Sequence, residues 1–186
     1  MSDIVTIAGS PSYPSRSSAV LEIIRERLEA RQFTTESIHV RSLPAEALLW
    51  GRADDVHIQE AIQAITDAYV VVVATPVYKA AYTGLLKAFL DVLPQQILAD
   101  KIVFPIATGG SQAHLLAIDY ALKPVLSALG AQHVLNGLYI QDSQLQYTDG
   151  LQLDPVIEQR LDKTIHSLSH HLIHSQSIAA PVAVGK

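Results

Sequence analysis

The stretch that decides the fold is Ile4-Val-Thr-Ile-Ala-Gly-Ser-Pro-Ser-Tyr-Pro-Ser-Arg-Ser-Ser18, near the start of the chain. Its first five residues are mostly β-branched and predict a short buried strand at 4–8. A loop rich in serine and proline follows and carries Arg16, and a helical pattern begins where the loop ends. Hydroxyl groups, a guanidinium and the free N–H groups of a helix start are suitable ligands for a phosphate monoester. The stretch therefore predicts a phosphate-binding loop between a strand and a helix.

This loop lacks the Gly-Lys-Ser/Thr of a Walker A motif and the GxGxxG pattern of dinucleotide-binding folds. It resembles the phosphate loop of flavodoxins, which implies flavin mononucleotide (FMN) rather than a nucleoside triphosphate as the ligand. The alternative is that the serines merely cap the helix and Arg16 is a solvated first-turn residue. Because a cation at the positive end of a helix dipole is unfavourable without an anion, anion binding is the preferred interpretation.

Length and composition indicate one domain that associates with copies of itself. The 186 residues are enough for a single core and contain no linker or repeat, so we expect one domain at 1–174 and a mobile tail at 175–186. Apolar residues make up 49% of the chain and charged residues only 17%, and the mean hydropathy is +0.24. Such an apolar composition favours burial of part of the surface against identical subunits.

Composition also excludes several classes of function. Cysteine is absent, which excludes disulfides, thiolate metal sites and cysteine nucleophiles. The net charge of −5 provides no basic surface for nucleic acid. The longest apolar run, at 69–74, is too short to span a bilayer, and the N-terminal residues lack the form of a signal peptide. We therefore expect a cytoplasmic protein without a membrane segment.

Strand and helix patterns alternate along the chain. Strands are predicted at 4–8, 36–40, 69–74, 102–108 and 133–140, the last one weaker and interrupted at Gly137. Helices are predicted at 17–31, 56–68, 83–93, 114–129 and 154–174, with an irregular stretch at 43–52. Five strands each followed by a helix predict a flavodoxin-like, doubly wound parallel sheet in the order 2-1-3-4-5, in three α/β/α layers. Ligands of such folds bind beyond the carboxyl ends of the strands, here where the first and third strands adjoin.

Two further loops are expected at that edge. The loop at 75–84 contains a Pro-x-Tyr turn that can bring backbone groups alongside a planar heterocycle, with Tyr78 packed on it. Lys79 can offset negative charge on a reduced flavin or bind a phosphate of an incoming cofactor, although an ordinary solvated lysine is the alternative. The loop at 107–112 has two glycines, which let the backbone approach a ligand closely or simply form a turn.

The motifs of these loops, taken together, resemble those of the NADPH-dependent FMN reductases. More narrowly, they resemble the reductase component of two-component alkanesulfonate monooxygenase systems. The similarity extends in order and spacing from Ile4 to about Asp142. The motifs are Gly-Ser-Pro-x-x-Pro-Ser-Arg-Ser-Ser, Ala-Thr-Pro-Val-Tyr-Lys-Ala-Ala-Tyr-x-Gly, Ala-Thr-Gly-Gly and Asp-Tyr-Ala-Leu-Lys-Pro-Val-Leu-Ser-Ala-Leu.

The resemblance implies a dimeric or tetrameric enzyme in which NAD(P)H reduces FMN. The reduced flavin then passes to a separate FMNH2-dependent monooxygenase that releases sulfite from organosulfonates. The implied phosphate ligands are Ser10, Arg16, Ser17 and Ser18. The residues implied to flank the ribityl chain and ring are Pro76, Val77, Tyr78, Lys79, Thr108, Gly109 and Gly110. No catalytic side chain is expected, because the flavin accepts the hydride directly. NADPH is the expected coenzyme and NADH remains possible, because no loop offers a recognisable pocket for the 2′-phosphate.

Three alternatives have different consequences. A flavin-bound quinone, azo or chromate reductase would share the fold, but Val77 and Lys79 stand where such enzymes often carry Glu and Asn. A flavodoxin-type electron carrier would be more acidic than this chain. A non-flavin α/β domain that binds anions would show no affinity for FMN.

The predicted helix at 114–129 contains Pro124 in its interior. Proline donates no hydrogen bond and clashes with the carbonyl four residues back, that of Tyr120, so the sequence predicts a kink or wide turn there. The resemblance implies a π-bulge at a tetramer interface, where the tyrosine is associated with release of flavin as a product. The alternative is a kinked core helix in which Tyr120 has no kinetic role.

Three histidines, His166, His170 and His174, lie at i, i+4 and i+8 on one side of the last predicted helix. Histidine pairs with this spacing bind zinc in some proteins. Because no carboxylate lies on the same stripe, a solvated helix face is the better interpretation, and no metal site is expected.

Overall fold

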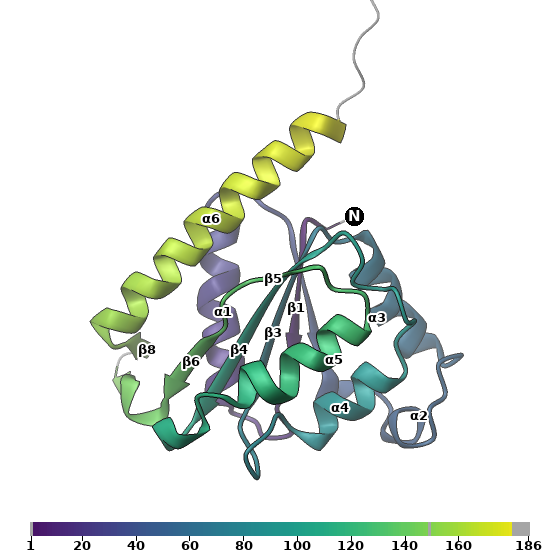
Figure 1. Ribbon diagram of the computed structural model, residues 1–186, viewed down its shortest axis with the longest axis horizontal. Coiled ribbons are helices and arrows are strands. Elements are labelled where there is room, and N and C mark those ends of the chain that lie inside the picture. The colour runs from purple at the N-terminus through teal and green to yellow at the C-terminus, as the bar shows by residue number, and fades with distance from the viewer. Residues whose placement is uncertain (1, 149, 180–186) are drawn as a thin grey trace, which may run out of the picture.

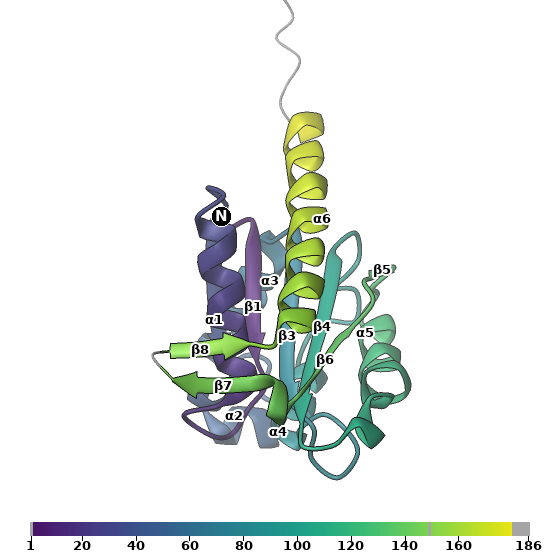
Figure 2. The ribbon, with the colours of Figure 1, turned by 90° about the vertical axis from the view of Figure 1, so that its left-hand side faces the viewer.

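A parallel β-sheet forms the middle layer of the structure, a computed structural model that describes residues 2–148 and 150–179. Its strand order is β2-β1-β3-β4-β5, and β6 also pairs with β4 (Figures 1 and 2). This order confirms the predicted doubly wound, flavodoxin-like topology. The strands are β1 (Ile4–Ala8), β2 (Thr35–His39), β3 (Val70–Pro76), β4 (Ile102–Gly109), β5 (His133–Val134) and β6 (Leu138–Gln141).

Helices cover both faces of the sheet, which gives the predicted three-layer arrangement. α1 and α6 pack on one face, and α3, α4 and α5 pack on the other together with the short α2 (Figure 1). The helices are α1 (Arg16–Glu29), α2 (Ala45–Leu49), α3 (Val56–Asp67), α4 (Gly84–Asp91), α5 (Lys123–Ala128) and α6 (Pro155–Ala179).

The strand residues alternate between two hydrophobic cores, which explains why β1 and β3 carry apolar side chains on both faces. Val5 and Ile7 of β1 belong to the core beneath α3 and α4, whereas Ile4 and Ala8 belong to the core beneath α1 and α6. β3 alternates in the same way. Each Å² of apolar surface removed from water contributes about 25 cal/mol, so a strand buried on both sides is held strongly in place. The loops that follow these strands therefore start from fixed points.

The register of the sheet brings three carboxyl ends to one edge. Ala8 at the end of β1 pairs with Ala74 of β3, and Pro76 at the end of β3 pairs with Thr108 of β4. The loops after β1, β3 and β4 therefore leave the sheet side by side, at the position where doubly wound folds bind ligands.

The fifth predicted strand is divided into β5 and β6, and Gly137 lies in the gap between them. A Cβ atom at Gly137 would lie 2.6 Å from the Cγ2 atom of Ile118. Only glycine lets the segment that contains Ile118 pack so closely on the backbone at this point.

That segment is a π-helix, Ile118–Leu122, which confirms the predicted disruption near Pro124. Pro124 lies in the first turn of α5 and has no N–H to donate. The N–H group of Lys123 donates to the carbonyl of Ile118, five residues back, which is the hydrogen bond of a π-helix. Tyr120 lies in the middle of this turn and is 78% exposed.

Three segments differ from the sequence prediction. The stretch predicted to be irregular contains α2, whose Ala47 and Leu48 are buried. An antiparallel hairpin of β7 (Leu145–Thr148) and β8 (Gly150–Leu153) was not predicted, because four residues are too few to show a clear period. α6 continues to Ala179, past the predicted end at His174, and the rest of the predicted mobile tail, 180–186, lies outside the described residues.

α6 extends beyond the edge of the sheet (Figures 1 and 2). Neither this helix nor any other within the described residues is long and apolar enough to cross a membrane.

Candidate functional site

A cavity of about 280 Å³ lies where the three loops meet, and we call it the flavin-type cavity. Its walls come from the loop after β1, the loop after β3, the end of β4 and the residue after β6. The lining residues are Ser10, Ser12, Pro14, Ser15, Arg16, Pro76, Val77, Tyr78, Thr108, Gly109, Gly110 and Asp142. Residues far apart in the sequence therefore share one pocket, as the predicted topology requires.

One end of this cavity faces the start of α1. Ser15 is the N-cap residue, and its side chain makes no capping hydrogen bond. The first N–H group to bond back to the Ser15 carbonyl is that of Ala19, at 2.9 Å. The backbone N–H groups of residues 16–18 have no carbonyl partner within the helix, so they are available to an anion at the positive end of the helix dipole.

Arg16 lies over the cavity and is held by an acidic residue. Its Nη1 atom is 3.6 Å from Oδ2 of Asp142, and the two side chains are 49% and 37% exposed. An exposed pair of this kind contributes about 0–1 kcal/mol, so a bound phosphate can displace it at little cost. Asp142 follows β6 and lies outside the motifs that indicated the site, so no sequence signal predicted its position.

The loop after β3 forms a tight turn at the opposite side. Tyr78 and Ala81 exchange backbone hydrogen bonds of 2.8 and 3.2 Å, and the two residues between them have positive φ angles, 50° at Lys79 and 67° at Ala80. Left-handed backbone costs about 1–2 kcal/mol for each residue with a side chain. The hydroxyl of Tyr78 lies 3.3 Å from the hydroxyl of Ser12 in the first loop. The strained turn therefore places Tyr78 against the phosphate loop.

Two buried threonines connect these two loops. The hydroxyl of Thr83 donates to the carbonyl of Gly9 and accepts a 3.1 Å hydrogen bond from the N–H of Leu86 at the start of α4. The N–H of Thr83 donates in turn to the hydroxyl of Thr75, at 3.2 Å. Both threonines are nearly inaccessible to solvent. Sequence reasoning missed this pair because capping threonines are common, and only the fold shows that one of them bonds across to Gly9.

Glycine is required at the end of β4. A Cβ atom at Gly109 would lie 2.6 Å from the hydroxyl oxygen of Tyr139. That hydroxyl donates a 2.5 Å hydrogen bond to the carbonyl of Ser111, which fixes the third loop. Burial raises the pKa of Tyr139, and the charge of Asp142 adds to the increase. The tyrosine thus remains a donor through the neutral pH range.

The structure brings most of the sequence-predicted residues to this cavity. Ser10, Arg16, Pro76, Val77, Tyr78, Thr108, Gly109 and Gly110 line it. Ser17 is completely buried, and its hydroxyl is 3.0 Å from that of Ser15. Ser18 faces an adjacent cavity, and Lys79 is exposed at its turn. The side chains of these three do not line the flavin-type cavity, although the N–H groups of Ser17 and Ser18 belong to the first turn of α1.

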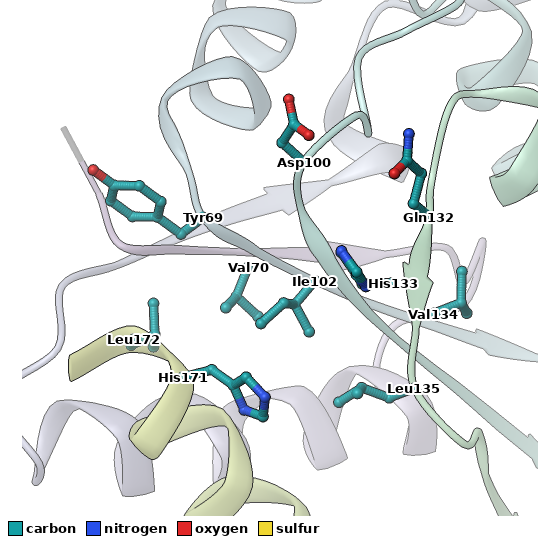
Figure 3. Close-up of a pocket in the computed structure, with 10 residues that line it drawn as sticks. All are labelled: Tyr69, Val70, Asp100, Ile102, Gln132, His133, Val134, Leu135, His171 and Leu172. Carbon is teal, nitrogen blue, oxygen red and sulfur yellow. The ribbon is translucent and has the colours of Figure 1, made fainter. Parts of the chain in front are cut away.

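A larger cavity, of about 630 Å³, lies at the other end of the sheet (Figure 3). It is bounded by the first residues of β3, β4 and β5 and by His171 and Leu172 of α6, and His133 and Asp100 lie on its opposite side. Ligands of doubly wound folds bind at the carboxyl ends of the strands, so size alone does not make this cavity the functional site. Within the described residues, no group of three or more His, Cys, Asp or Glu side chains can hold a metal ion.

The lining of the flavin-type cavity combines possible anion ligands with backbone that carries no side chains. Hydroxyls, free N–H groups and Arg16 lie at one end, which suits a phosphate. Gly109 and Gly110, which carry no side chains, line the cavity together with Pro76 and Val77. The cavity therefore offers anion ligands at the start of α1 and unobstructed backbone at Gly109 and Gly110.

Comparison with known proteins agrees with this geometry. Residues 2–145 match the family model described as NADPH-dependent FMN reductase. A relative from Pseudomonas putida KT2440, named FMN reductase (NADPH), is 47% identical over 96% of this chain and 92% of its own length. A relative of the same name from Escherichia coli K12 is 44% identical over 96% of this chain and 93% of its own length.

A solved structure extends the comparison to three dimensions. The apo form of an NADH:FMN oxidoreductase (EMOB) superposes with a TM-score of 0.83 at 40% identity, covering 92% of this chain and 90% of that chain. The names of the two relatives thus specify NADPH, whereas that of the structural neighbour specifies NADH.

Proposed function

Because the chain belongs to the NADPH-dependent FMN reductase family, we propose that it transfers a hydride from NAD(P)H to FMN in the flavin-type cavity. The observation that carries the proposal is the convergence of three loops on one pocket, with anion ligands at one end and unobstructed backbone at the other. The names of its relatives support NADPH as the coenzyme and leave NADH as an alternative.

The phosphate of FMN binds at the start of α1 in this proposal. The N–H groups of Arg16, Ser17 and Ser18 point along the helix axis towards it, and the hydroxyl of Ser10 and the charge of Arg16 complete the site. Ser17 and Ser18 act through their backbone, since their side chains lie elsewhere.

The residues after β3 and β4 orient the ribityl chain and the ring. Pro76–Lys79 lie on one side and Thr108–Gly110 on the other, and the N–H of Val77 donates to the carbonyl of Thr108 at 2.7 Å, which holds the two segments together. Bound FMN supplies the hydride acceptor itself, at N5 of its ring. The chain has to keep one face of the ring open to the nicotinamide at about 3–3.5 Å, so no general acid or base is assigned.

We also propose that the reduced flavin leaves this site and supplies an FMNH2-dependent alkanesulfonate monooxygenase in the cytoplasm. The loop motifs that resemble the reductases of such systems support this role. So does the rim of the cavity, where Tyr78 is 47% exposed and Arg16 is held only by an exposed ion pair. A flavin bound at this rim can dissociate without unfolding of the core.

Steady-state kinetics test the proposal. The purified protein is assayed for oxidation of NADPH and of NADH, with and without added FMN, and then with a quinone in place of FMN. We expect a rate that depends on added FMN and saturates with it. A rate that needs only tightly bound flavin and a quinone would support the alternative, a quinone, azo or chromate reductase. The absence of any change in FMN fluorescence on titration would refute a flavin site altogether.

Association through the π-helix is the final part of the proposal. Tyr120 is 78% exposed and Leu116 is 54% exposed, and together with Leu115 they form an apolar surface suited to a dimer or tetramer contact. If this contact promotes flavin release, deletion of Tyr120 leaves the purified protein yellow with bound FMN. A colourless and fully active deletion variant would contradict the role of Tyr120 while leaving the reductase proposal intact.

A further inference from the structure

A second cavity, of about 380 Å³, lies on the other side of the phosphate loop, and we call it the β2 cavity. It shares Ser10, Pro14 and Ser15 with the flavin-type cavity, so the two are separated only by the loop itself. Its remaining walls come from the loop tip, from α1 and from the segment after β2. A ligand bound over the flavin-type cavity can therefore reach across the loop into the β2 cavity.

Arg41 is the principal cation of the β2 cavity. It follows β2, and its Cζ atom lies 5.3 Å from the centroid of the Tyr13 ring in the phosphate loop. Stacking on an aromatic ring uses the flat face of a guanidinium and leaves the N–H donors along its edge available. In the part of the chain that the structure describes, Arg41 forms no ion pair, whereas three arginines of α1 are each paired with a carboxylate.

The other polar groups of the β2 cavity also favour an anion. His39, at the end of β2, and Ser18, in the first turn of α1, both line it. The acidic lining residue is Glu22, and its carboxylate is held by Nε of Arg25 at 2.8 Å. A guanidinium, an imidazole and a hydroxyl therefore face the cavity, and the one carboxylate among its lining residues is already paired.

We propose that the β2 cavity binds the adenosine 2′-phosphate of NADPH and that Arg41 selects NADPH over NADH. This inference rests on the proposed reductase function and concerns how the coenzyme is recognised. The 2′-phosphate is the only group by which NADPH differs from NADH, and an arginine edge binds its oxygens in a bidentate manner. Tyr13, 80% exposed, offers a ring on which the adenine stacks while the nicotinamide reaches the flavin-type cavity.

The experiment compares the two coenzymes in the wild type and in Arg41→Ala, with FMN saturating. We expect the KM for NADPH to rise about tenfold and the KM for NADH to change less than about twofold, since a charge-assisted hydrogen bond is lost only with NADPH. Arg41→Lys retains the charge without the planar fork and is expected to lie between the two. Arg160→Ala, which removes an exposed arginine from α6, serves as the matched control and leaves both values unchanged.

Binding without turnover provides a second readout. Adenosine 2′,5′-bisphosphate, titrated by calorimetry, is expected to bind the wild type more tightly than adenosine 5′-phosphate does, and Arg41→Ala should abolish the difference. If Arg41→Ala raised the KM for NADPH and for NADH equally, or raised neither, the inference would be overturned while the wild type remained an FMN reductase. A wild type that oxidises neither coenzyme would instead refute the proposed function, and the inference with it.

Discussion

Substitutions of the two partners of the ion pair over the flavin-type cavity should have opposite effects on the affinity for FMN. Arg16 lies 3.6 Å from Asp142, and both line the cavity. If Arg16 binds the FMN phosphate, Arg16→Ala removes a charge-assisted hydrogen bond worth about 1.5–3 kcal/mol, less the roughly 0.5 kcal/mol needed to break the exposed pair. The net loss of about 1.5 kcal/mol raises the Kd for FMN about tenfold.

Asp142→Asn should have the reverse effect. A phosphate held by Arg16 would lie about 7 Å from this carboxylate, where a dianion and a unit charge repel by about 1.2 kcal/mol in water and by about half of that at physiological salt. Removing the carboxylate charge also frees Arg16. We therefore expect Asp142→Asn to lower the Kd for FMN about two- to threefold.

Quenching of FMN fluorescence on titration measures both values. The matched control is Asp162→Asn, which makes the same acid-to-amide change on α6, in a carboxylate paired with Arg27 of α1. It should leave the Kd for FMN unchanged. The effect of Asp142→Asn should shrink in 0.5 M salt, as screening requires. If both Arg16→Ala and Asp142→Asn weakened FMN binding, the pair would serve to hold the loops in place, and the assignment of Arg16 to the phosphate would be refuted.

Three further predictions concern the loops. Gly109→Ala places a Cβ atom 2.6 Å from the Tyr139 hydroxyl and should lower the free energy of unfolding, measured with urea, by about 1–3 kcal/mol. A Cβ atom at Gly110 would have its nearest neighbour at 3.8 Å, so Gly110→Ala should lower it by less than about 0.5 kcal/mol. Equal losses of stability would contradict the steric argument. Ala80→Gly relieves left-handed backbone and should raise the free energy of unfolding by about 0.5–1 kcal/mol, and an unchanged or lower melting temperature would refute the strain. Burial raises the pKa of Tyr139, so its hydrogen bond stabilises the fold below pH 10 and is lost as pH rises through the raised pKa. Tyr139→Phe should therefore lower the free energy of unfolding by about 1 kcal/mol at pH 7 and by progressively less above pH 10. A loss of stability that did not depend on pH would exclude this linkage.

The fold could be predicted from the sequence because its decisive signals are local. β1 begins and ends at the predicted residues, 4 and 8, because a β-branched run is followed directly by Gly9. Gly9 packs against Leu86 of α4. The wide turn at Tyr120 was predictable for the same reason, because a proline inside a helical pattern removes a hydrogen bond and clashes with the carbonyl four residues back. The hairpin of β7 and β8 and the short α2 depend on burial against distant elements, and no local period indicates them.

The site was less accessible to sequence reasoning, because its parts meet only through the sheet register. Three loops could be placed together from the strand order alone, but Asp142 and Arg41 follow β6 and β2, outside those loops, and reach the phosphate loop only in the folded chain. The orientation of α1 decides which of the serine hydroxyls face the cavity. Ser17 reads as a phosphate ligand in the sequence, yet α1 turns its side chain completely into the interior.

Two features of these residues bear on how tightly the proposed site would hold FMN. Arg16 already has a carboxylate partner, so part of what it gains from the phosphate is offset by the exposed pair that it gives up. The turn at Lys79 and Ala80 is closed by its own backbone hydrogen bonds, so it places Tyr78 in advance and keeps the ordering cost of binding low. If FMN binds here as proposed, a site that is preorganised but only partly neutralised favours release of the flavin after its reduction. Asp142→Asn should therefore slow the release of FMN by about the same two- to threefold factor by which it lowers the Kd.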